Sequence, residues 1–199
     1  MTEPGEAQVA LEPALVELRQ RLDEDLAALL AAVADVSQEQ ADWKPAPERW
    51  SVGELLHHLG LANRQFARAV AMLIGRGRSE GLAAPPGSRR AWPRMRSIAD
   101  ASRSGPIKHP ARVTPTRGLP VDELRRELAA SHAAVAEQIP GLAALDLDAL
   151  RFPHPLGFEL NLYQWVDITG AHERRHLAQI NAVIASPGFP APASRRPDA

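Results

Sequence analysis

The chain has 199 residues, no cysteine and a formal net charge of −1 at neutral pH. Its length suits one domain, and its near-neutral charge predicts neither a nucleic-acid partner nor a membrane surface as partner. The lack of cysteine excludes disulfides, thiolate metal ligands and a cysteine nucleophile. Apolar residues make up 45 % of the chain and aromatic residues 5 %, and the abundance of Ala and Leu favours helices over strands.

The N-terminal segment has no apolar core of the kind that a secretory signal needs. No apolar run approaches the roughly 18 residues that suggest a membrane span. We therefore expect a cytoplasmic protein. Residues 1–9 are expected to be flexible, residues 10–186 to form one domain, and the Pro-rich residues 187–199 to form a disordered tail.

Two helices are predicted in the first part of the chain. The first covers about residues 11–36, where apolar residues recur three and four apart on one helix face. After a break with two prolines, Ser51 and Glu54 have the spacing of a capping box, so a second helix is expected to begin there. It is expected to run to about Ile74, because Gly75 and Gly77 follow and glycine commonly ends helices.

Residues 76–120 differ from the rest of the chain. This stretch holds seven prolines and little periodicity, and its ten basic and two acidic residues give it a local charge of about +8. We interpret it as a long basic crossover between the second and third helices. It could attract an anionic cofactor or substrate, or it could be a solvated loop.

Two more helices are predicted after the crossover. The third covers about residues 121–139 and is closed by Pro140 and Gly141. A loop rich in Pro and Gly follows, with the sequence RFPHPLGFEL. Asn161 and Gln164 can then cap a fourth helix that reaches about residue 185. The sequence therefore predicts an all-α four-helix bundle with an up-down-down-up course, in which the long crossover lets the second and third helices run in the same direction.

Histidines on the fourth helix indicate a metal site. His172 and His176 are four residues apart, so their imidazoles lie about 40° apart on one helix face. Two neutral imidazoles suit Zn, Ni, Fe or Mn. The letters HERRH also match the HExxH signature of zinc proteases. The residues downstream, however, contain no His or Glu as third ligand, so that ligand is expected from upstream.

The second helix offers two candidates for the third ligand. His58 lies at the edge of the apolar face, whereas His57 lies almost opposite the centre of that face. His58 is therefore the better ligand, and His132 on the third helix is held in reserve. Three histidine ligands leave coordination positions open, which favours catalysis or substrate binding over a structural role. Gln179 lies close to His172 on the helical wheel and could orient a ligand ring.

Two stretches of the chain resemble the DinB-like (YfiT-like) superfamily. The first is WSVGELLHHL at residues 50–59, and the second extends from HPLGF at 154–158 to HLAQI at 176–180. The resemblance covers roughly residues 10–186. It implies an up-down-down-up bundle, often a homodimer, with one metal ion on three histidines. By motif match these are His58, His172 and His176.

The resemblance also suggests an activity. Characterised relatives include transferases and isomerases that depend on glutathione, mycothiol or bacillithiol, and in these the metal is thought to activate the cofactor's thiol. We therefore interpret the chain as a metal-dependent transferase that binds a low-molecular-weight thiol and a small-molecule substrate. The nature of the thiol is left open.

Two alternatives remain at this stage. In a metal-dependent hydrolase, Glu173 would be the general base and would take a proton from water. Glu173 could instead form a buried salt bridge with Arg64 or Arg68. The second alternative is a non-catalytic, metal-stabilised binding or stress-response protein.

Other candidate residues are given structural roles. His154 is treated as structural. Trp43 and Trp50 are expected to cover the end of the bundle, and Arg175 is expected to pair with a carboxylate. His109 is expected to be solvated.

Overall fold

The fold is mostly helical in the computed structural model, which describes residues 12–84 and 110–191. Four helices are long: α1 (Pro13–Val33), α3 (Val52–Ser79), α5 (Val121–Ala136) and α6 (Leu162–Ile184). The short elements are α2 (Gln38–Asp42), η1 (Ala111–Val113), η2 (Ile139–Leu142) and the strands β1 (Arg151–Pro153) and β2 (Glu159–Asn161). The prediction of an all-α protein is confirmed.

Three predicted segments lie wholly or partly outside the described residues. They are the N-terminal segment 1–9, most of the crossover 76–120 with His109, and the end of the tail 187–199. Among the helices that the structure describes, none is both long and apolar enough to span a membrane.

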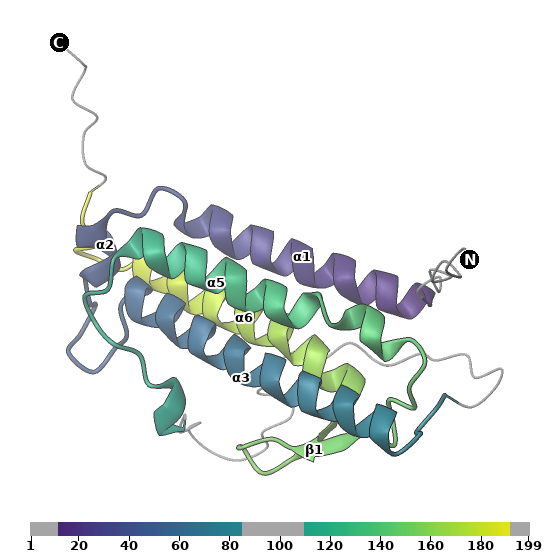
Figure 1. The fold of residues 1–199 in the computed structure, drawn as a ribbon. Coiled ribbons are helices and arrows are strands. Elements are labelled where there is room, and N and C mark those ends of the chain that lie inside the picture. The colour runs from purple at the N-terminus through teal and green to yellow at the C-terminus, as the bar shows by residue number, and fades with distance from the viewer. Residues whose placement is uncertain (1–11, 85–109, 192–199) are drawn as a thin grey trace, which may run out of the picture.

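The four long helices lie side by side (Figure 1). Helix α3 packs against α5 and α6, and α1 packs mainly against α6. Their inward residues are the Leu, Val and Ile positions predicted from the three-and-four spacing, and most of these are fully buried. Helix α6 is buried on most of its surface, because it contacts both α1 and α3.

The predicted capping boxes at the starts of α3 and α6 are confirmed. The Ser51 hydroxyl accepts from the backbone N–H of Glu54, and the Glu54 carboxylate accepts from the N–H of Ser51. Asn161 and Gln164 make the same reciprocal pair at the start of α6. Each box satisfies two backbone donors that a helix start would otherwise leave unpaired, so it fixes where each helix begins.

The predicted end of the second helix is wrong. Helix α3 continues through Gly75 and Gly77 to Ser79. Gly77 is buried because two leucine side chains approach its Cα closely. A Cβ at this position would lie 2.7 Å from Leu150 and 3.1 Å from Leu145. The glycine here permits close packing within a helix and does not end it.

The segment after the third helix also differs from the prediction. Helix α5 ends at Ala136, and residues 139–142 form the separate turn η2. Part of the predicted loop is a hairpin, in which β1 and β2 pair in antiparallel register with Phe152 opposite Leu160. Gly157 adopts a φ of 87° in its turn. The indole N–H of Trp165 donates to the Phe152 carbonyl (3.2 Å), which ties the hairpin to α6.

The close approach at Gly77 can be tested against a glycine on the same helix. Gly75→Ala should raise stability by roughly 0.5–1 kcal/mol, because nothing lies within 4 Å of its added Cβ and alanine favours a helix interior. Gly77→Ala gains the same helix preference but overpacks against Leu145 and Leu150, which typically costs about 1–3 kcal/mol. Thermal unfolding should therefore place Gly77→Ala below Gly75→Ala. Equal unfolding temperatures would contradict this packing.

Candidate metal centre and cavity

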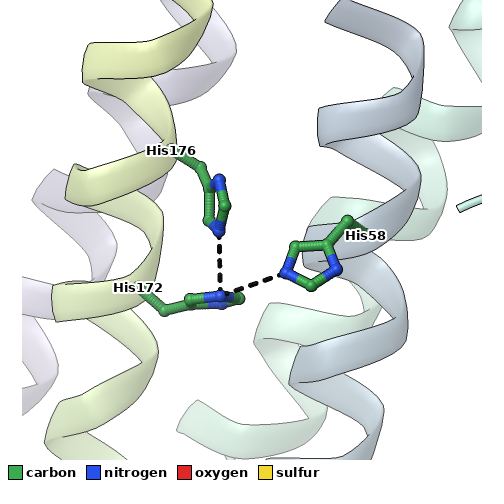
Figure 2. A group of neighbouring side chains, drawn as sticks. All are labelled: His58, His172 and His176. Atoms are coloured by element: carbon green, nitrogen blue, oxygen red, sulfur yellow. Dashed lines mark hydrogen bonds between the residues drawn. The ribbon is translucent and has the colours of Figure 1, made fainter. Parts of the chain in front are cut away.

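Three buried histidines meet between α3 and α6. His58 lies in the second turn of α3, and His172 and His176 lie on adjacent turns of α6. Figure 2 shows the three imidazoles close together, with His172 hydrogen-bonded to both of the other rings. The side chains are 5–7 % exposed, and their ligand nitrogens all lie within 4.8 Å of one another. The structure thus brings together the three histidines selected from the sequence.

Hydrogen bonds fix the tautomers of two rings. The Nδ1–H of His58 donates to the backbone carbonyl of Val113 (2.7 Å). The Nδ1–H of His176 donates to the Oε1 of Gln179 (2.6 Å). Because a carbonyl oxygen accepts only, each Nδ1 carries the proton, and each Nε2 then carries the lone pair of its ring. Such outer partners orient and tune histidine ligands in metal sites.

Both lone pairs point toward the same atom. The Nε2 of His172 lies 3.3 Å from the Nε2 of His58 and 3.0 Å from that of His176. Nitrogens about 2.1 Å from a tetrahedral zinc ion lie roughly 3.4 Å apart. A single N–H on His172 could donate a good hydrogen bond to only one of the two Nε2 lone pairs, of His58 or of His176. A cation, by contrast, can be coordinated by all three rings. The donor set and its spacing therefore fit a divalent metal ion.

The surroundings keep the rings of His172 and His176 neutral. Burial lowers the pKa of His172 well below its usual value, and the nearby His176 and His58 lower it further. Burial is also the main cause that lowers the pKa of His176 to about 3, although its hydrogen bond to Gln179 acts in the opposite direction. A metal ion binds the neutral imidazole, so these rings need lose no proton to act as ligands at pH 7.

A cavity of about 430 Å³ opens onto the three histidines. Its apolar walls include Trp50, Phe66, Met72, Phe152, Leu156 and Trp165. Its polar lining, apart from the three histidines, includes Gln65, Arg68, Arg112, His154, Arg175 and Gln179. A mainly apolar cavity with a small number of polar groups is typical of small-molecule binding sites. The arrangement can hold a ligand beside an ion on the three histidines.

The structure corrects the predicted role of Trp50. Its ring centre lies 4.9 Å from that of His58 and 6.5 Å from that of His176. Trp50 therefore forms a wall of the site. Trp43 instead packs edge-on against Phe189.

His154 and Arg175 also differ from the prediction. His154 stacks on Phe158 and lines the cavity, where burial and the nearby Arg112 lower its pKa to about 4. Its Nδ1 accepts from the backbone N–H of Leu156 (3.2 Å), so Nε2 carries the proton of the neutral ring. Arg175 makes no ion pair within residues 12–84 and 110–191; it lines the cavity instead.

Glu173 faces away from the cavity into a second buried cluster. Its Oε1 accepts from the amide of Asn63 (2.8 Å) and from the Nδ1–H of His132 (3.0 Å). The predicted salt bridge to Arg64 or Arg68 is wrong, since Arg64 lies 3.6 Å from Glu127. His132, the reserve ligand, belongs to this cluster. Glu173 does not line the cavity, so this geometry gives no support to it as a base there.

The chain belongs to the DinB superfamily, whose family model matches residues 21–180. It is 27 % identical over 149 residues to the uncharacterized protein YuaE of Bacillus subtilis (strain 168), an alignment that covers 74 % of this chain and 85 % of YuaE. No solved structure is significantly similar. Family membership and a buried three-histidine group together define a DinB-type protein with a candidate metal centre.

The cluster around Glu173 should contribute to stability. Glu173→Ala leaves His132 and Asn63 without their partner in the core, at a cost of about 1–3 kcal/mol. Chemical unfolding should show this loss. In the control Glu24→Ala, the replaced glutamate is exposed and its carboxylate accepts from Gln20, so stability should change by less than about 0.5 kcal/mol. Equal effects of the two substitutions would refute the structural role of the cluster.

Proposed function

We propose that this protein is a metal-dependent enzyme of the DinB superfamily, a transferase that activates a low-molecular-weight thiol. His58, His172 and His176 would hold the ion, and Gln179 would orient the His176 ring. The observation that carries the proposal is the convergence of three Nε2 atoms, two of them with fixed lone pairs, at the inner end of the cavity. The proposed scaffold is an up-down-down-up bundle. In Figure 1 both α3 and α5 start at the end near α2, which supports that course.

The side chains that line the cavity favour a ligand that itself carries the nucleophile. No Asp or Glu lines the cavity within the described ranges, and His154 offers an N–H there, so the cavity has no evident base for activating water. When bound, a divalent ion lowers the pKa of a thiol beside it and so supplies a nucleophilic thiolate. This is why the transferase is preferred to the hydrolase with Glu173 as base.

The metal centre can be tested by mass spectrometry of untagged protein. About one Zn, Ni, Fe or Mn ion per chain is expected. His58→Ala and His172→Ala should lose it, because two ligands hold an ion much less tightly than three. His57→Ala is the matched control: His57 is adjacent in sequence, but its Nδ1 accepts from the backbone N–H of Thr116, and metal should be retained.

Substitution of the outer partner gives a graded test of the same centre. Gln179→Ala should weaken metal affinity by about 10- to 100-fold, as is typical when an outer partner of a ligand histidine is lost. Gln65→Ala, which changes another glutamine of the cavity lining, should leave affinity unchanged. Absence of metal in gently purified protein, with no uptake of Zn, Ni or Mn on titration, would reject the centre and leave the non-catalytic alternative.

The thiol hypothesis predicts a rate that depends on added thiol. With metal-loaded protein, glutathione and chlorodinitrobenzene, the thiolate sulfur attacks the ring carbon, the thioether forms and chloride leaves. The rate should rise with thiol and fall to background in His172→Ala. Mycothiol and bacillithiol should be tested in the same way. A p-nitrophenyl ester that is hydrolysed without thiol would favour the hydrolase instead. The homodimer implied by the family resemblance stays a prediction that sedimentation would test.

A further inference from the structure

The cavity has a strongly one-sided charge. Three of its lining residues are arginines, and no carboxylate lines it within the described part of the chain. The whole chain, by contrast, has a net charge of −1. The three arginines come from three elements: Arg68 from α3, Arg112 from η1 and Arg175 from α6. A concentration of one sign of charge in a hollow with apolar walls focuses the electric field on a bound ligand.

These arginines are available to a ligand. Other arginines of the chain pair with acids, such as Arg64 with Glu127 and Arg76 with Glu80. The side chains of Arg68, Arg112 and Arg175 make no hydrogen bond or ion pair with any residue that the structure describes. Two of the three are exposed, and Arg175 is half-buried. The charge of Arg112 also reaches into the cavity, since its guanidinium contributes to lowering the pKa of the lining residue His154.

The cavity also presents apolar surface to solvent. The described residues include three exposed large hydrophobic side chains, and two of them, Met72 (44 %) and Phe152 (38 %), line this cavity. Behind them, Phe66 and Trp165 lie with ring centres 6.0 Å apart. Exposed apolar groups gathered at one hollow indicate a place where an apolar body binds. Flat rings on the walls suit a flat or aromatic body.

We propose that the cavity binds a small organic oxyanion with a flat apolar body. The acidic group would lie against Arg68, Arg112 and Arg175, and the body against the aromatic walls. Guanidinium groups recognise carboxylate and phosphate alike, in two-point hydrogen-bonded geometry. The inference rests on the proposed function in that it assigns the substrate class of the same cavity. Its test does not require metal.

Three naphthalene probes of similar size separate charge from shape. They are 2-naphthoate, 2-naphthyl phosphate and neutral 2-naphthamide, and each is titrated into chelator-treated protein by calorimetry, with the quenching of tryptophan fluorescence as second readout. Both anions should bind at least tenfold more tightly than the amide, and less tightly as salt is raised. The tighter of the two anions identifies the acidic group. Equal affinity of all three would overturn the proposal.

Single substitutions identify the groups that hold the anion. Arg112→Gln and Arg175→Gln should each weaken binding of the preferred anion about tenfold and leave the amide unaffected, with circular dichroism confirming that each variant is folded. Arg64→Gln is the matched control, one turn from Arg68 on α3 but directed to Glu127. Unchanged anion affinity in both variants would refute the role of the arginines. Anion binding that appears only in metal-loaded protein would also refute the role of the arginines, because the anion would then be held by the metal ion.

Discussion

The rest of the structure depends on the orientation of α6 about its own axis, that is, on which of its residues face which neighbouring element. This helix is buried on most of its surface and carries polar groups on two sides. His172 and His176 face α3 and the cavity, while Glu173 faces Asn63 and His132. Turning the helix by one residue would bury both sets against apolar neighbours without partners, at a cost of several kcal/mol. Only one orientation of the helix gives hydrogen-bond partners to Glu173 and also directs His172 and His176 toward His58. The cluster around Glu173 therefore helps to set the geometry of the three histidines.

The five residues of the motif HERRH at 172–176 belong to different clusters. The letters HERRH suggest a zinc ligand, a general base and a second zinc ligand. In this fold the glutamate is fully buried and does not line the cavity, and the first arginine, Arg174, pairs with Asp25 of α1. The second arginine lines the cavity. Gly170 lies one turn before Arg174 and lets α1 approach closely, since a Cβ there would lie 3.1 Å from Leu22. The same five residues thus contact three different surroundings.

Helical spacing, together with the family resemblance, was sufficient to select the three histidines, although not the other cavity residues on the helices, such as Arg68 and Arg175. The apolar faces of α3 and α6 give their orientation, and orientation places His58, His172 and His176 on facing surfaces. The sequence could not show that Glu173 would pair with His132, because this depends on which helix lies beside α6. Trp50, Arg112 and His154 were missed as cavity residues for a similar reason. They lie outside the four long helices, where periodicity carries no information, and their positions follow from the tertiary path of the chain.

The partner of His58 has a consequence for how this site can change. Its Nδ1–H is held by the backbone carbonyl of Val113, at the point where the crossover returns to the bundle. Every amino acid supplies a carbonyl, so the side chain at position 113 can vary without removing the acceptor. The spacing between Val113 and the start of α5 at Val121 cannot vary as freely, because an added or deleted residue there would move the carbonyl relative to α3. An insertion or deletion between residues 113 and 121, 55 or more residues from His58 in sequence, would thus act directly on the candidate metal centre, whereas a side-chain substitution at position 113 can leave the hydrogen bond intact.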